Sequence, residues 1–325
     1  MDFGRETKSV MDIGIFPLTA KTARLEALRS FAKALSQTEH RVTWAEQEGY
    51  RRCDLAVIYG SPGVGTGRRR RARQAIISRH TGPVLIIETP LFGRKIPMLQ
   101  RRALPFLRSS SSETFDRFRI ALNGCFWDNG IFCNEPTDAQ RWERLRCELG
   151  LEIRDYRQHG DHILLVGQVP GDASLRGLDV VSWLESTVID LSAWSDRPIV
   201  IRPHPLSGYA ALNALARRLR SRGLTNWEIR SGGALSEALR NAWATITYSS
   251  GAAIESILMG VPALSMCPAS MAWPVSDHEL GKIETPTLFD RRHWLDRLAH
   301  SQWALSEIGN GTVWARFRDK IAELI

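Results

Sequence analysis

Two short motifs in the second half of this 325-residue chain carry residue types suited to binding a phosphate group. In the first motif an apolar segment ends at Ser249, Ser250 and Gly251, and a helical pattern follows over residues 252–259. The first amides of a helix lack acceptors and carry the positive end of its dipole, so two hydroxyls and a glycine at this turn predict an anion site. Glu255 follows about one helical turn later and is expected to face the same mouth. This chemistry fits a diphosphate or a nucleoside monophosphate leaving group.

The second motif is His204, which stands between two prolines after an apolar strand pattern over residues 198–202. A lone histidine is usually structural, but here the prolines restrict the backbone and Arg202 adds a second hydrogen-bond donor. Gln168 and Asp172 lie in a third loop, after the preceding strand pattern. Because the carboxyl ends of parallel strands meet at one edge of a sheet, we expect the three loops to line one crevice.

A glycine-rich loop in the first half, residues 60–67, also follows a buried strand pattern. It is not the phosphate loop of an NTPase, because Thr66 stands where that motif requires lysine. A flexible loop at the ligand-binding end of a strand is the weaker interpretation that remains. An arginine-rich helical pattern follows it and contains Arg68, Arg69, Arg70, Arg71 and Arg73. Guanidinium groups match phosphate geometry, so contact with a phosphate backbone is one interpretation, and a solvated helix face is the other.

Three further residues of the first half are candidate site residues. Glu88 ends a strand pattern and is the first candidate for a catalytic base, and Asp128 is the second. Trp127 lies beside Asp128 in a loop that concentrates polar and aromatic residues. Its ring is a candidate for stacking on a base or a sugar, although a plain structural loop is the simpler explanation.

Composition and charge bound the class of protein. With 43% hydrophobic residues, the chain is long enough for one large domain or two ordinary ones. It has no apolar run of about 18 residues and no signal-like N-terminus, and its five cysteines lack metal-ligand spacing, so we expect a cytoplasmic protein with reduced thiols and no metal site. Residues 1–155 carry 26 Lys and Arg against 18 Asp and Glu, whereas residues 156–325 carry 17 of each. This asymmetry predicts that the first half meets a polyanion, unless it is only a solvated basic surface.

Strand patterns alternate with helical patterns in both halves, which predicts βαβ units and parallel sheets. We therefore expect an α/β protein with a basic first domain over residues 1–155 and a second domain over residues 156–305. A terminal helix over residues 306–325 should brace the first domain. Residues 105–140 are less regular and indicate long loops or an antiparallel excursion, and the polar stretch over residues 154–161 is the linker candidate.

The second half resembles the nucleotide-sugar-binding domain of GT-B glycosyltransferases over residues 160–270. The His-Pro and Ser-Ser motifs are similar to those of bacterial sialyltransferases and capsule-type Kdo transferases, which use CMP-activated sugars. The stretch from Gln168 to Asp172 also resembles capsule-synthesis proteins and putative DNA-modifying glycosyltransferases of phages. The resemblance implies two Rossmann-like domains facing a cleft. It implies that His204, Ser249 and Ser250 hold the donor phosphate and that Glu255 binds donor hydroxyls.

The resemblance and the charge together suggest a metal-independent glycosyltransferase whose co-substrate is a CMP- or UDP-linked sugar, with no cofactor. The basic first half favours a polyanionic acceptor, and a hydroxymethyl-pyrimidine base in phage DNA fits it best, which would place the protein in the cytoplasm of a bacterial host. A growing surface glycan is the alternative acceptor. A nucleotide-sugar epimerase and a non-catalytic DNA-binding protein on the same fold are the alternatives from other functional classes.

Overall fold

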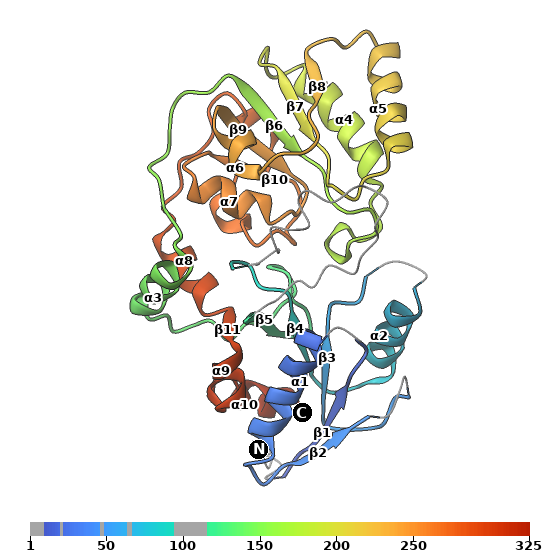
Figure 1. The fold of residues 1–325 in the computed structure, drawn as a ribbon, viewed down its shortest axis with the longest axis vertical. Coiled ribbons are helices and arrows are strands. Elements are labelled where there is room, and N and C mark those ends of the chain that lie inside the picture. Colours follow the sequence, from blue (N-terminus) through green and yellow to red (C-terminus); the bar gives the residue numbers. More distant parts are fainter. Residues whose placement is uncertain (1–9, 20–21, 46–48, 64–66, 94–115) are drawn as a thin grey trace, which may run out of the picture.

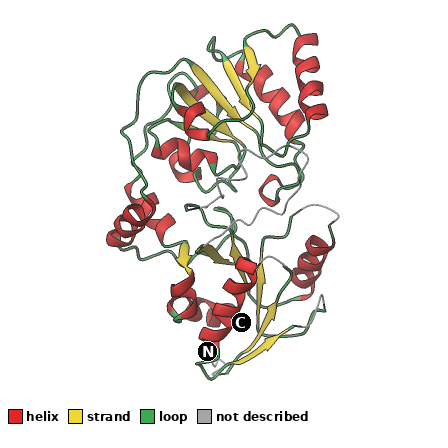
Figure 2. Cartoon of the chain, in the orientation of Figure 1, coloured by secondary structure: helices red, strands yellow, loops and turns green. Residues whose placement is uncertain are grey.

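The computed structural model describes residues 10–19, 22–45, 49–63, 67–93 and 116–325, and two β-sheets organise this part of the chain (Figures 1 and 2). The six strands of the first sheet run in the order β11-β5-β4-β3-β1-β2. These strands are β1 (Asp12–Phe16), β2 (Arg41–Trp44), β3 (Leu55–Tyr59), β4 (Val84–Glu88), β5 (Arg117–Leu122) and β11 (Gln302–Ala304). Strands β1 to β4 are parallel, and β5 is antiparallel to both of its neighbours.

The second sheet is parallel throughout and has the order β10-β9-β6-β7-β8. Its strands are β6 (His162–Val166), β7 (Ile199–Arg202), β8 (Trp227–Ile229), β9 (Ala242–Thr247) and β10 (Ala263–Ser265). All five residues of β6 are buried, which explains why its sequence is a continuous apolar run rather than an alternating one. The order reverses at β6, so ligands are expected at the carboxyl edge beside this strand.

Helices cover both faces of each sheet (Figure 2). The first sheet is flanked by α1 (Thr22–Leu35), α2 (Arg68–Arg79), α9 (Leu305–Gly309) and α10 (Thr312–Leu324), and the second by α4 (Val180–Leu191), α5 (Tyr209–Ser221), α6 (Leu235–Leu239) and α7 (Ala252–Leu258). Helices α3 (Ala139–Leu149) and α8 (Arg292–Ala299) pack against each other, and α8 also contacts β11. Helix α1 buries Leu28, Phe31 and Leu35, whose spacing keeps them on one side of the helix. Helix α4 begins where Asp179 accepts a hydrogen bond from the amide of Ser182 at 2.9 Å.

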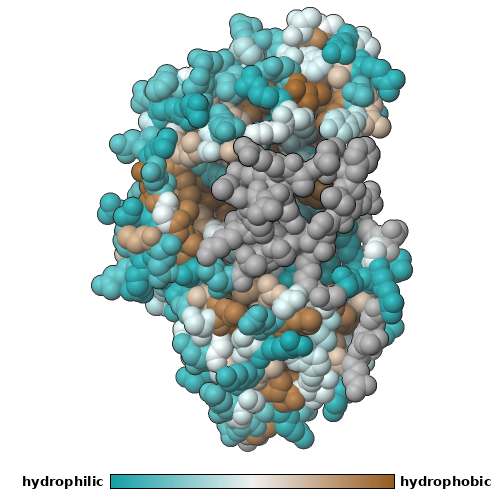
Figure 3. Space-filling view, viewed as in Figure 1, coloured by the Kyte–Doolittle hydropathy of each residue, from teal (hydrophilic) through white to brown (hydrophobic). Residues whose placement is uncertain are grey.

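One of the hydrophobic clusters contains residues from both halves of the molecule. Trp142 of α3 packs in the same cluster as Ile254 of α7 and Leu298 of α8, and Figure 1 shows α3 beside α8 at the waist of the molecule. In Figure 3 both ends of this face are mainly hydrophilic, and hydrophobic side chains appear at the left of the waist, near α7 and α8. The halves are therefore joined by packed side chains as well as by the irregular segment over residues 150–161.

The expected α/β class is confirmed, with differences in detail. Strand β5 supplies the antiparallel excursion within residues 105–140, and Ser109 to Ser112 lie outside the described residues. Helix α6 ends at Leu239, because β9 already begins at Ala242. The chain returns to the first sheet with β11 at Gln302, before the boundary expected at residue 305. All five cysteines are free.

Candidate functional site

The Ser249–Gly251 turn connects β9 to α7 at the carboxyl edge of the second sheet. The Ser250 hydroxyl oxygen accepts a hydrogen bond from the amide of Ala252 at 3.2 Å, so its own proton remains available to a ligand. Within the described part of the chain, the amides of Ser250 and Gly251 have no acceptor. Helix α7 has only seven residues. The turn's own amides and hydroxyl, more than a helix dipole, therefore give it an affinity for anions.

Gln168 fixes this turn from the neighbouring strand. Its side-chain oxygen accepts from the amide of Ser249 at 2.8 Å, and its amide nitrogen donates to the hydroxyls of Ser174 at 3.0 Å and Ser249 at 3.2 Å. Asp172 in turn accepts from the amide of Ser174 at 2.9 Å and from its hydroxyl at 2.7 Å. Gln168, Ser174 and Ser249 are all buried. These side chains thus position the loops of the site, whereas Ser250 faces outward.

His204 follows β7 and adopts a defined tautomer. Its Nδ1 accepts a hydrogen bond from the amide of Leu206 at 3.1 Å, so a neutral ring carries its proton on Nε2 and can donate it. Arg202 plays a different part from the expected one. Its two terminal nitrogens donate to the carbonyl oxygens of Gly232 at 2.8 Å and Gly233 at 2.7 Å, which secures the loop before α6.

The first domain contributes Glu88 and Arg119, which are register partners on β4 and β5. The Glu88 carboxylate accepts from the amides of Ser61 at 2.9 Å and Thr89 at 2.8 Å. Burial alone would raise the pKa of Glu88, but the charge of Arg119 and these two amides outweigh it and lower the pKa. Glu88 is therefore ionised at neutral pH.

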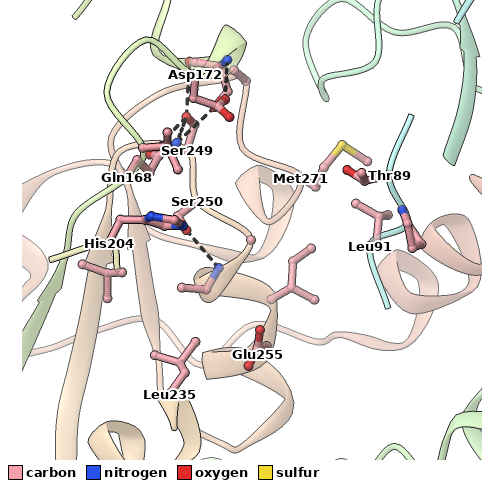
Figure 4. Close-up of a pocket in the computed structure, with 18 of the residues that line it drawn as sticks. Thr89, Leu91, Gln168, Asp172, His204, Leu235, Ser249, Ser250, Glu255 and Met271 are labelled. Atoms are coloured by element: carbon pink, nitrogen blue, oxygen red, sulfur yellow. Dashed lines mark hydrogen bonds between the residues drawn. The ribbon is translucent and has the colours of Figure 1, made fainter. Parts of the chain in front are cut away.

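These residues line one cleft of about 680 Å³ between the two sheets. Figure 4 shows Gln168, Ser250 and His204 on one wall, with Thr89 and Leu91 of the first domain opposite. Residues predicted from the sequence that line the cleft are Glu88, Gln168, Asp172, Arg202, His204, Ser249, Ser250, Gly251 and Glu255. The structure thus brings together loops that are far apart in the sequence.

Asp128 and Trp127 do not line this cleft; both serve contacts between the domains. The Asp128 carboxylate pairs with Arg176 of the second domain, with both oxygens 2.6 Å from the same guanidinium nitrogen. The Trp127 ring lies 4.4 Å from the guanidinium of Arg297, and its amide donates to the carbonyl of Ala269 at 3.4 Å. The simpler explanation of this loop, a structural one, fits both residues, and Asp128 is poorly placed to act as a base.

The arginines of α2 lie outside the cleft and do not act as one group. Arg68, Arg69 and Arg71 are exposed, whereas Arg73 is half-buried and donates to the carbonyl of Tyr59 at 3.5 Å. Gly60 adopts φ +87°, and a Cβ there would meet the Arg73 guanidinium at 3.3 Å. Arg73 therefore belongs to the interior beneath the glycine loop, of which residues 64–66 lie outside the described part.

Sequence reasoning missed Arg119 and Ser174. Arg119 is only 8% exposed, and its side chain lies on the opposite face of β5 from Phe118 and Ile120, which enter the core against α1. An arginine within a strand of alternating apolar residues could have indicated Arg119 as a site residue. Residues 105–140 showed no clear strand pattern, so the position of Arg119 in a strand was not recognised. Ser174 carried no signal, because its partners come from two loops.

The described residues show neither a metal site nor a membrane-spanning helix. No three His, Cys, Asp or Glu side chains among them are grouped so that they could hold a metal ion. No helix among them is long and apolar enough to cross a bilayer.

Comparison with solved structures finds the same fold in two proteins from Thermosulfurimonas dismutans. KpsC, beta Kdo 2,4 transferase, is 15% identical, with a TM-score of 0.54 and 90% of each chain covered. KpsC, beta Kdo 2,7 transferase, is 12% identical, with a TM-score of 0.50 and coverage of 95% of this chain and 99% of that one. At these identities the likeness concerns the fold. It confirms the expected GT-B architecture of two Rossmann-like domains facing a cleft. No protein-family model and no curated protein matches the sequence.

Proposed function

We propose that the protein is a glycosyltransferase whose second domain binds the nucleotide part of a CMP- or UDP-linked sugar and whose first domain binds the acceptor. One observation carries this proposal. The Ser249–Gly251 turn, His204 and the Gln168 loop follow three different strands and meet on one wall of a cleft whose other wall is the first domain. The cleft volume of about 680 Å³ lies within the range of small-molecule sites.

The phosphate that leaves with the nucleotide would be bound by neutral donors. These are the Ser250 hydroxyl, the amides of Ser250 and Gly251, and the Nε2–H of His204. Fixed donors aimed at a group that gains negative charge stabilise the transition state without reorganising. In this proposal they replace a metal ion, so turnover should persist in the presence of EDTA.

Three carboxylates line the cleft. Asp172 holds Ser174 in place. We propose different roles for the other two, Glu88 and Glu255, which lie on opposite walls. Glu88 remains the first candidate for the catalytic base. Among the described residues of the first domain, it is the one carboxylate that lines the cleft. Its lowered pKa makes it a weak proton acceptor and favours a second role, which is to stabilise the positive charge that develops on the donor sugar. Glu255 is exposed on α7 and suits hydrogen bonds to donor hydroxyls.

For the acceptor we favour a sugar hydroxyl of a surface glycan over a base in DNA. The two similar structures are described as Kdo transferases, which supports this choice through their fold only. The DNA interpretation is based on the basic first half, with Trp127 as an aid to holding a base turned out of the stack, and that side chain packs against Arg297 instead. The exposed arginines of α2 still support a DNA acceptor. If DNA is the acceptor, the affinity of the protein for DNA should fall steeply as the salt concentration rises.

The proposal is tested by melting the protein with CMP, UDP and GDP sugars and then measuring transfer with the best donor. His204→Ala should lower turnover about 100-fold or more without lowering the melting temperature. His159→Ala removes an exposed histidine outside the cleft and serves as the matched control. Near-normal transfer by His204→Ala would contradict the site assignment.

The same experiment separates the other functional classes. An epimerase would convert a nucleotide sugar with no acceptor present. A non-catalytic DNA-binding protein would bind DNA but show no thermal shift with any nucleotide sugar.

A further inference from the structure

Arg119 is a buried cation whose guanidinium makes no hydrogen bond or ion pair with a described residue. The residue is 8% exposed, and its Nε is shielded from solvent without a hydrogen bond. Buried hydrogen-bond donors without an acceptor are costly, so an unsatisfied buried guanidinium calls for an explanation such as a ligand.

The neighbouring carboxylate of Glu88 offsets the charge of Arg119 but accepts no hydrogen bond from its guanidinium. Glu88 is its register partner on β4, but both Glu88 oxygens already accept backbone amides. Two more guanidinium groups, those of Arg24 and Arg73, act on the same carboxylate. Each of them also has an Nε that is buried without a hydrogen bond. Three guanidinium groups therefore interact electrostatically with one carboxylate, and the local excess of positive charge is suited to a second anion.

Arg119 lines the cleft, so a ligand can reach this charge. The Phe126 ring lies 5.8 Å from its guanidinium, and Phe92 and Leu151 line the same part of the wall. A guanidinium beside apolar and aromatic surface suits a sugar that carries one acidic group, because the ring contacts the apolar wall and the acid pairs with arginine.

We propose that Arg119 is a specificity-determining residue that binds an anionic group, a carboxylate or a phosphate, of the substrate held against the first-domain wall. The assignment rests on the proposed function, since it takes that wall to be the acceptor side. It makes charge recognition a property of the cleft itself rather than of the arginines on α2.

The test compares three hexoses by saturation-transfer NMR and calorimetry: glucose, glucuronate and glucose 6-phosphate. We expect the protein to bind at least one anionic sugar about tenfold or more tightly than glucose, the advantage of a hydrogen bond to a charged group. Glucuronate and glucose 6-phosphate distinguish a carboxylate site from a phosphate site. Equal binding of all three sugars, or no binding of either anion, would overturn the proposal.

Variants assign the preference to one side chain. R119Q should abolish it, and R119K should keep part of it, because lysine retains the charge but not the planar fork. R117Q is the matched control on the same strand, because Arg117 pairs with Glu148 and does not line the cleft. An anion preference that survives in R119Q, or that is lost equally in R117Q, would refute the role of Arg119.

Nucleotide affinity, measured on the same samples, separates this proposal from the proposed function. R119Q should bind CMP and UDP as the unmodified protein does, because the groups proposed to donate hydrogen bonds to the nucleotide lie on the other wall of the cleft. If neither nucleotide binds but the anion preference is present, the glycosyltransferase proposal fails and the anion site stands. If nucleotides bind and the preference is absent, the anion site alone fails.

Discussion

Replacement of Gln168 by leucine should destabilise the protein and disturb the nucleotide site together. The leucine would leave the amide of Ser249 buried without its acceptor at 2.8 Å, and would remove the 3.0 Å bond to Ser174. Two hydrogen bonds at about 1 kcal/mol each, with the penalty for an unsatisfied buried amide, give a loss of about 2–4 kcal/mol. For a protein of 325 residues the melting temperature should fall by about 3–6 °C.

The assay is calorimetry of Gln168→Leu beside a matched control. Gln74→Leu also removes a glutamine, but Gln74 is exposed and makes one hydrogen bond, to the carbonyl of Gly63 at 2.9 Å. Its loss should be about 1 kcal/mol or less. Gln168→Leu should also bind CMP or UDP more weakly, because the Ser249 turn loses its anchor. Equal melting temperatures for the two variants would refute the idea that Gln168 holds the turn.

Three other predictions follow from packing and charge contacts elsewhere in the molecule. Gly63→Val would place side-chain atoms against Ala173, whose Cα already lies 3.3 Å from a Cβ at Gly63, so turnover should fall about tenfold or more, whereas Gly67→Ala has open space and should not change it. Arg141→Ala should lower the free energy of unfolding in urea by about 2–4 kcal/mol, because it leaves the half-buried Glu307 without its ion pair at 2.5 Å. A loss of about 1 kcal/mol or less, as for an exposed ion pair, would contradict this. Burial lowers the pKa of three histidines in the folded protein. As the pH falls below about 6.5 these side chains are protonated in the unfolded chain before they are in the folded one, so the free energy of unfolding should decrease. They are His80, His162 and His300. Constant stability between about pH 7.5 and 5.5 would contradict that assignment.

The sequence predicted the second domain better than the first, for a physical reason. Parallel strands buried on both faces, such as β6, are continuous apolar runs, and caps such as Asp179 mark helix starts locally. The carboxyl-edge rule then brought His204 and Ser250 to one cleft. These features depend on a few neighbouring residues, so they can be read from the chain alone.

The rest depended on contacts between distant residues. Gln168 and Asp172 line the site as expected, but their atoms are used to hold the loops, which no local pattern reveals. Trp127 and Asp128 have polar and aromatic character suited to a site, yet their partners Arg297 and Arg176 come from the other half of the chain. Charge counts could not distinguish the exposed arginines of α2 from a buried one such as Arg119.

The return of the chain to the first sheet sets an order for folding during synthesis. The core between the first sheet and α1 contains Trp303, Ile308 and Phe317, so it stays incomplete until the ribosome has released residues beyond 302. The second sheet needs nothing from that segment and can form while α1 still lacks its cover. Because domains fold as units as they emerge, the half that contains the second sheet should be assembled first, and the half that contains the first sheet should be completed last.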